Sequence, residues 1–69
     1  MEVDVCKRLG ENLKRLRHAA GRSQEGFAHD ADLHRTYVSD LERGARNPTI
    51  RVVDRLAKAL GVGLGDLLD

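Results

Sequence analysis

The sequence contains few of the residues that fill large cores or separate domains. Aromatic residues make up 3% of its 69 residues, Trp is absent, and Pro48 is the only proline. Leu, Val and Ala must therefore form the core, and the scarcity of proline favours helices throughout. We expect a single domain over residues 1–69, with a core so small that association would add needed stability.

Further absences narrow the class of protein. One cysteine, Cys6, excludes an internal disulfide and fits a reducing compartment. No apolar run reaches the roughly 18 residues of a membrane span, and the acidic segment 1–5 lacks the apolar stretch of a secretion signal. We therefore expect a cytoplasmic protein that does not enter a membrane.

The usual signatures of catalysis and cofactor binding are also missing. His18, His29 and His34 do not combine with Cys6 in zinc-finger spacing. The sequence contains no glycine-rich phosphate loop and no defensible pair of nucleophile and base. We expect no metal, no cofactor and no enzyme.

Apolar residues recur at helical spacing, and this periodicity predicts an all-α fold of five helices. The last helix, within residues 62–69, should be short and weak because it contains Gly63 and Gly65. The side chains expected to face the core are Val5, Leu9, Leu13, Leu16 and Ala20 in the first helix, Phe27, Ala28 and Ala31 in the second, Val38 and Leu41 in the third, and Ile50, Val53, Leu56, Ala57 and Leu60 in the fourth.

Residues 23–44 predict two short helices joined by a tight turn. Ser23 is a good N-cap for the first, and Gly44 is a good stop for the second, which we expect over about residues 34–43. Thr49 can cap the helix that follows them. Asp32 falls at the turn, where Asp tolerates a left-handed backbone better than most residues do. This is the pattern of a helix-turn-helix, whose second helix enters the DNA major groove.

Charge is unevenly distributed along the chain. The net charge is only +1, which by itself gives little attraction to nucleic acid. Residues 34–58, however, hold six cations and three anions, a local balance of +3, whereas residues 21–33 are net −2. Within the basic stretch, Arg51, Arg55 and Lys58 form a stripe that we interpret as a solvated face, with Asp54 and Lys58 spaced to pair.

A resemblance covers residues 9–68. The chain resembles the phage-repressor-like (Cro/XRE-type) helix-turn-helix family, which implies a compact five-helix DNA-binding domain with the motif at the second and third helices. The matching residues are Leu13-x-x-Leu16-Arg17, Ser23-Gln24-Glu25, Ala28, Tyr37-Val38-Ser39-x-Leu41-Glu42-Arg43-Gly44, Asn47-Pro48-Thr49 and Leu56-Ala57-x-Ala59-Leu60-Gly61-Val62.

Within that family, residues 35–39 and 43–48 are similar to the controller proteins of restriction–modification systems. The chain departs from the family at Asp32, where Gly is usual, and at His34, where Ser or Thr usually caps the third helix. Asp40 stands where many members have a neutral or basic residue. Glycines at positions 26, 63 and 65 replace helix formers or caps, which bears on rigidity more than on function.

The polar side of the third helix supplies the expected base contacts. Arg35 can make two hydrogen bonds to guanine, or it can be a solvated residue paired with Glu25 or Asp32. The other expected base contacts are Thr36, Tyr37, Ser39 and Asp40. Thr36 suits a thymine methyl or a phosphate, and Tyr37 can instead pack inward. Asp40 can accept a hydrogen bond from cytosine N4 or can repel wrong sequences.

Phosphate contacts are expected around this helix. Gln24 lies in the first turn of the second helix, where unpaired backbone amides favour an anion, and the resemblance supports the same role. Arg43, Arg46 and Asn47 border the loop after the third helix. The resemblance also implies a structural salt bridge between Arg17 and Glu42.

A single recognition helix reads few base pairs, so we expect a homodimer on a pseudo-palindromic DNA operator with half-sites roughly 34 Å apart. Bound near a promoter, it would block or recruit RNA polymerase; the controller resemblance implies control of its own operon. The leucine-rich C-terminal end offers the expected dimer surface, with core packing as the alternative for some of its members: Leu60, Val62, Leu64, Leu67 and Leu68.

Two other classes of function compete with this interpretation. An antitoxin would use the same DNA-binding fold and also sequester a toxin, although the chain is short for wrapping a partner. A helical protein-interaction module would need no DNA, but it leaves the polar first turn of the third helix unexplained.

Overall fold

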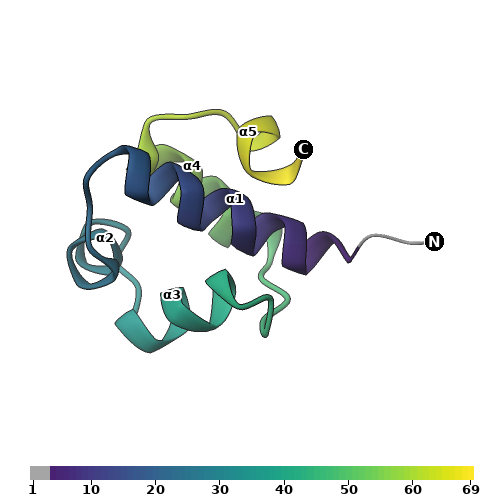
Figure 1. Cartoon of the computed structure of the whole chain (residues 1–69), viewed down its shortest axis with the longest axis horizontal. Coiled ribbons are helices and arrows are strands. Elements are labelled where there is room, and N and C mark those ends of the chain that lie inside the picture. Colours follow the sequence, from purple (N-terminus) through teal and green to yellow (C-terminus); the bar gives the residue numbers. More distant parts are fainter. Residues whose placement is uncertain (1–3) are drawn as a thin grey trace.

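The computed structural model describes residues 4–69, and over that range the chain forms five α-helices and no strand (Figure 1). This confirms the predicted all-α fold. The expectation that segment 1–5 lacks a secretion signal concerns mainly residues 1–3, which lie outside the described residues. The helices are α1 (Val5–Ala19), α2 (Gln24–Asp30), α3 (Arg35–Glu42), α4 (Ile50–Leu60) and α5 (Leu64–Leu68).

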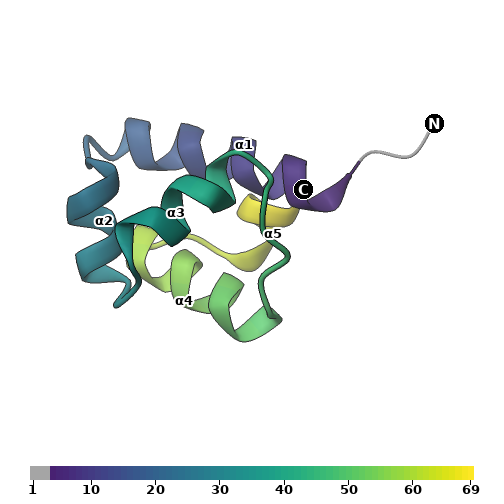
Figure 2. The same cartoon turned by 90° about the horizontal axis from the view of Figure 1, so that it is seen from below.

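Helix α1 organises the packing. It contacts both α3 and α5, while α2 packs on α3 and α4 packs on α5. Figure 2 shows α3 in front when the molecule is seen from below, with α1 and α4 on either side of it. The shared core is made of the buried side chains of Leu9, Leu13, Phe27, Ala28, Ala31, Val38, Leu41, Val53, Leu56, Ala57 and Leu67.

Three residues expected in the core lie outside it. Val5 is 48% exposed and Ile50 is 61% exposed, because each is the first residue of its helix and no neighbouring element covers that end. Ala20 is exposed at the C-cap of α1, past the last helical turn. Helical periodicity identifies the apolar face correctly, but it does not say how far along the helix a neighbour extends.

The predicted helix boundaries depend on caps that the structure confirms. The Ser23 hydroxyl accepts a hydrogen bond from Gly26 N at 3.0 Å, and the Thr49 hydroxyl accepts from Val52 N at 3.2 Å. Gly44 has a φ of +75°, the left-handed conformation that ends a helix. These local features mark where α2 and α4 begin and where α3 ends.

Gly10 permits the closest approach between α1 and α3. A Cβ atom at this buried position would lie 2.3 Å from the Leu41 carbonyl oxygen. No side chain fits that distance, so a glycine inside α1 lets the recognition-helix candidate pack directly on it. Helical periodicity alone gives no indication of this role for Gly10.

The short helix α5 is held by polar side chains of α1. Arg8 Nε donates to the Leu68 carbonyl at 2.8 Å, and Asn12 Nδ2 donates to the Leu67 carbonyl at 2.8 Å. Carbonyls at a helix C-terminus lack partners within the helix, so these bonds satisfy them. Tertiary contacts therefore stabilise a glycine-containing segment whose own helix propensity is weak.

Candidate nucleic-acid interface

The turn between α2 and α3 sets the direction of α3. Asp32 has a φ of +56°, the left-handed conformation predicted for it. His34 caps α3, with its Nδ1 accepting from Thr36 N at 3.1 Å, so a histidine replaces the hydroxyl cap usual in the resembled family. Val38 and Leu41 are buried on one side of α3, while Arg35 and Thr36 are exposed on its first turn.

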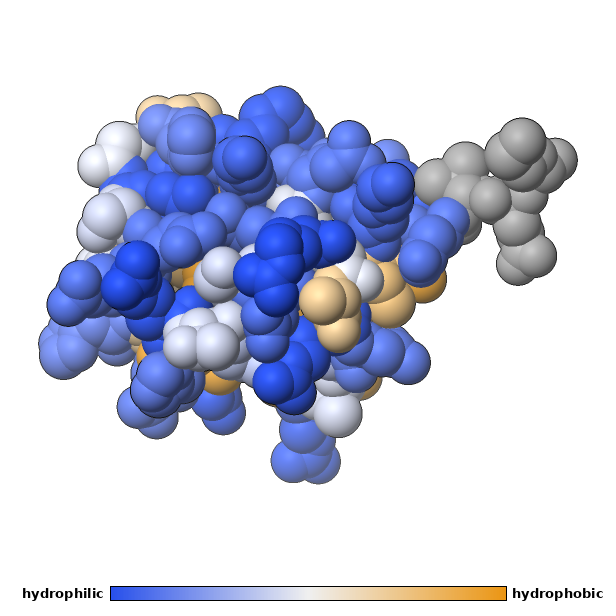
Figure 3. Space-filling view, turned by 60° about the horizontal axis from the view of Figure 1, so that its bottom comes forward, coloured by the Kyte–Doolittle hydropathy of each residue, from blue (hydrophilic) through white to orange (hydrophobic). Residues whose placement is uncertain are grey.

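Six of the predicted contact residues line one hollow between α2 and α3. Its volume is about 290 Å³, and it is open to solvent. Figure 3 shows that the face turned toward the viewer, the lower side of Figure 1 where α3 lies, is mostly hydrophilic. The hollow is lined by Gln24, Arg35, Thr36, Ser39, Asp40 and Arg43.

Arg35 is available for an external partner. Among residues 4–69, the structure gives its guanidinium no hydrogen bond and no ion pair, so the alternative pairing with Glu25 or Asp32 is not formed. Thr36 is likewise exposed beside it. Two hydrogen-bonding side chains thus project from the start of a helix whose backbone is capped.

Side chains of α3 and of the segment that follows it form a different arrangement, which we call the Asp40 cluster: Tyr37, Ser39, Asp40, Arg43 and Arg46. One carboxylate oxygen of Asp40 accepts from Arg43 Nη2, and the other accepts from Arg46 Nε at 3.2 Å. Arg43 Nη1 also donates to Ser39 Oγ at 3.1 Å. The guanidinium of Arg46 lies 5.4 Å from the centroid of the Tyr37 ring, a cation–π contact.

These contacts change the electrostatics of the expected phosphate-binding residues. The hydrogen bonds from Arg43 and then Arg46 lower the pKa of Asp40. Arg43 and Arg46 are therefore partnered cations rather than free ones. Tyr37 is half-buried against the core, the inward placement considered for it, and its ring supports the Arg46 guanidinium.

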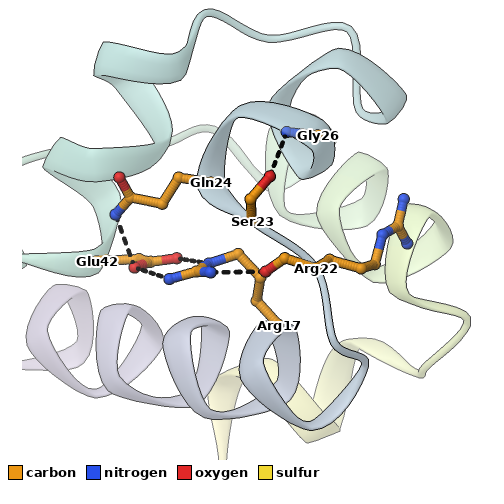
Figure 4. A network of polar contacts seen from close by, with 6 residues as sticks. All are labelled: Arg17, Arg22, Ser23, Gln24, Gly26 and Glu42. Carbon is orange, nitrogen blue, oxygen red and sulfur yellow. Dashed lines mark hydrogen bonds and ion pairs between the residues drawn. The ribbon is translucent and has the colours of Figure 1, made fainter.

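Gln24 is directed into the protein rather than outward. Its Nε2 donates to Glu42 Oε1 at 3.0 Å. Figure 4 shows Gln24 at the edge of a network in which Arg17 binds Glu42 through two hydrogen bonds, of 2.6 and 3.0 Å, and the Arg22 carbonyl through one of 2.7 Å. The predicted salt bridge between Arg17 and Glu42 is confirmed.

Burial and hydrogen bonding act in opposite directions on Glu42. Removal from water by itself raises the pKa of this carboxyl, but the hydrogen bonds from Arg17 and Gln24, with the Arg17 charge, outweigh it and the pKa is lowered. The Glu42 bond raises the pKa of Arg17. Glu42 therefore stays ionised and connects α1, α2 and α3 at one point.

Asn47 lies apart from the hollow. It lines an apolar groove of about 240 Å³ between α1, α4 and α5, whose other lining residues include Val5, Pro48, Ile50 and Leu68. Its Oδ1 is 3.8 Å from Cys6 Sγ. The structure does not bring Asn47 together with Arg43 at the mouth of the α3 hollow, although both border the same loop.

The predicted dimer surface needs one correction. Leu67 is fully buried, so it belongs to the core and offers nothing to a second copy. Leu60, Val62 and Leu68 are half-buried, and Leu64 is 36% exposed. Val5 and Ile50, which were expected in the core, are surface residues instead, and their position at helix starts was the available signal.

The remaining observations concern α4 and the described part of the chain as a whole. On α4, Lys58 Nζ lies 3.1 Å from Asp54 Oδ2, as their spacing predicted. In the part of the chain that the structure describes, three or more possible metal ligands do not gather anywhere. No helix between residues 4 and 69 has both the length and the apolar character needed to cross a membrane.

Comparison with known proteins places this geometry in a family. A family model described as a helix-turn-helix domain matches residues 8–69. The control protein C.BamHI of Bacillus amyloliquefaciens is 46% identical over 62 residues, covering 88% of this chain and 76% of that protein.

Solved structures agree. The restriction–modification controller protein C.AhdI from Aeromonas hydrophila has a TM-score of 0.87 at 39% identity, covering 90% of this chain and 94% of its own. The biofilm regulator SinR in complex with DNA has a TM-score of 0.84 at 31% identity, covering 88% of this chain and 98% of its own. The chain belongs to the helix-turn-helix domain family.

Proposed function

We propose that this protein is a sequence-specific DNA-binding transcriptional regulator. The observation that carries the proposal is the exposed pair Arg35 and Thr36 on the capped first turn of α3, whose side chains make no hydrogen bond or ion pair with any other residue between 4 and 69. A helix of this kind fits the major groove, where side chains reach base edges. The relative SinR, solved with DNA, supports the same use of the fold.

Arg35 is the principal base reader in this proposal. Its planar fork matches guanine O6 and N7, while Thr36 and Ser39 offer hydroxyls to neighbouring bases. The ring of Tyr37 is partly covered, which leaves its outer edge for the DNA. Gln24, Arg43, Arg46 and Asn47 would contact phosphates; contacts of this kind set register and affinity.

For Gln24, that role requires its side chain to leave Glu42, or the backbone amides at the start of α2 to act alone.

We further propose that the regulator acts as a homodimer. Val5, Ile50 and Leu68 line the apolar groove, Leu64 is also exposed on α5, and a second copy of the chain would cover these side chains. Burying them offsets the small core expected for a chain of this length. Two copies would present their α3 helices to half-sites roughly 34 Å apart.

The narrower role is that of a restriction–modification controller. Control proteins of such systems, C.BamHI and C.AhdI, match the chain along most of its length. As a controller, the protein would bind near its own promoter and exclude or recruit RNA polymerase. That polymerase contact belongs to the proposal.

The test is selection of bound duplexes from a random library at physiological salt, followed by sedimentation of the complex. The proposal expects a palindromic consensus and two chains per duplex. Affinity should fall with salt, and each neutralised phosphate should add about 0.9 to the downward slope of log affinity against log salt concentration. No enrichment of any sequence would overturn it and favour a protein partner, such as a toxin, as the main ligand.

A further inference from the structure

The carboxylate of Asp40 is enclosed by two cations. Its side chain is 16% exposed, whereas those of Arg43 and Arg46 are 62% and 52% exposed. Both of its oxygens accept from a guanidinium, one from each arginine. The carboxylate is therefore covered by the very side chains that are expected to meet DNA phosphates.

Arg43 is held from two sides. Nη2 binds Asp40 and Nη1 binds Ser39, so its guanidinium is fixed along one edge of the hollow that Arg35 and Thr36 also line. Arg46 is fixed between Asp40 and the Tyr37 ring. A long side chain that is already ordered loses less conformational freedom on binding a correctly shaped partner.

The same contacts oppose indiscriminate binding. Non-specific affinity for DNA comes almost entirely from cations that neutralise phosphates. Arg43 and Arg46 can serve a random phosphate only by giving up or sharing Asp40, and the carboxylate itself repels the phosphate. A duplex that also satisfies Arg35 and Thr36 gains base contacts that a random duplex lacks.

We propose that Asp40 is a specificity-determining residue that acts through Arg43 and Arg46: it positions both arginines, which follow α3, and suppresses their non-specific pairing with phosphates. This inference rests on the proposed function. It differs from direct reading of cytosine by Asp40, because both carboxylate oxygens already have partners within the protein.

The experiment compares the wild type with Asp40→Asn on two labelled duplexes, the consensus selected from the random library and a scrambled version of it. We expect Asp40→Asn to bind the scrambled duplex roughly tenfold more tightly. The slope of log affinity against log salt for that duplex should steepen by the equivalent of about one to two phosphates, at about 0.9 per phosphate. Affinity for the consensus should rise less, so the ratio of the two affinities falls.

Asp32→Asn is the matched control. It removes the same charge from the turn before α3, its carboxylate has no hydrogen bond or ion pair among the described residues, and Asn also tolerates the left-handed backbone found there. An equal change in salt slope and in affinity ratio for both variants would overturn the proposal, since net charge would then explain everything. Loss of binding to both duplexes by Asp40→Asn would equally overturn it.

A double-mutant cycle identifies the route. In an Arg43→Gln, Arg46→Gln background, Asp40→Asn should no longer tighten binding to the scrambled duplex, because the side chains through which it acts are gone. An unchanged effect in that background would contradict the proposed route. If the wild type selects no consensus at all, the proposed function has failed, an outcome distinct from any of these.

Discussion

Arg17 and Glu42 join the last turn of α1 to the end of α3 through two hydrogen bonds, and their side chains are only 8% and 4% exposed. Gln24 adds a third bond to the same carboxylate from the start of α2. Three helices that must keep a fixed relation for α3 to reach DNA therefore share one buried anion.

Replacing Glu42 by Ala should lower the free energy of unfolding by about 3 kcal/mol or more, because it leaves the buried Arg17 charge without its partner. Chemical denaturation measures the loss, and Glu25→Ala on the exposed side of α2 is the control. The consensus selected by the folded variant should not change. A denaturation midpoint equal to that of the wild type would contradict the structural role of this pair.

Acid should weaken the same connection. The folded-state pKa of Glu42 lies below its unfolded value, so its contribution to stability is complete above the unfolded pKa of about 4.3 and is lost as pH falls from there through the folded pKa. We expect unfolding free energy to drop more steeply in the wild type than in Glu42→Gln below about pH 4.3. Parallel acid profiles for the two proteins would argue against this.

Gly10→Ala tests the close packing of α1 on α3. Its new methyl group would lie 2.3 Å from the Leu41 carbonyl oxygen, so the helices must separate. Overpacking of this kind costs roughly 1–3 kcal/mol, more than Ala gains in helix propensity. Gly65→Ala is the matched control, since its Cβ would meet only the movable Asp69 carboxylate, at 3.3 Å. Thermal melts should show Gly10→Ala destabilised and Gly65→Ala unchanged or stabilised.

Ile50→Lys tests the dimer surface. Ile50 is 61% exposed in the single chain, so a lysine there should leave the fold intact while placing a charge in the proposed contact. Sedimentation equilibrium should show a weaker dimer. A thermal melt at low protein concentration should match that of the wild type. Leu67→Ala should behave differently, losing about 2–5 kcal/mol of stability because it opens a cavity in the core. Unaltered association of Ile50→Lys would remove this face from the interface.

The sequence predicted the features of the fold that depend on local chemistry. Ser23 and Thr49 are short polar residues just before apolar periodic segments, and the structure has both as N-caps. Asp32 was expected in the left-handed turn because it falls where the chain must turn and Asp tolerates that backbone better than most residues do. Such features need only a few neighbouring residues.

Features that depend on distant parts of the chain could not be predicted in the same way. Whether Val5 and Ile50 are covered depends on where α5 ends in space. Gln24 has the chemistry for either a phosphate or Glu42, and only the position of α3 decides between them in the free protein. Arg43 stands three residues after Asp40, a spacing that predicts pairing, but Arg46 reaches the same carboxylate only because the chain reverses at Gly44.

The most direct test of base reading by α3 replaces one hydrogen-bond acceptor of the DNA, guanine N7, by a C–H group. A consensus duplex with 7-deazaguanine, which lacks the N7 acceptor but keeps O6, should bind the wild type more weakly, by part of the roughly 1–3 kcal/mol that a bidentate arginine–guanine contact contributes. Arg35→Ala should bind the modified and unmodified duplexes equally, because the donor is already absent. An equal loss in both proteins would contradict the assignment of Arg35 as the base reader.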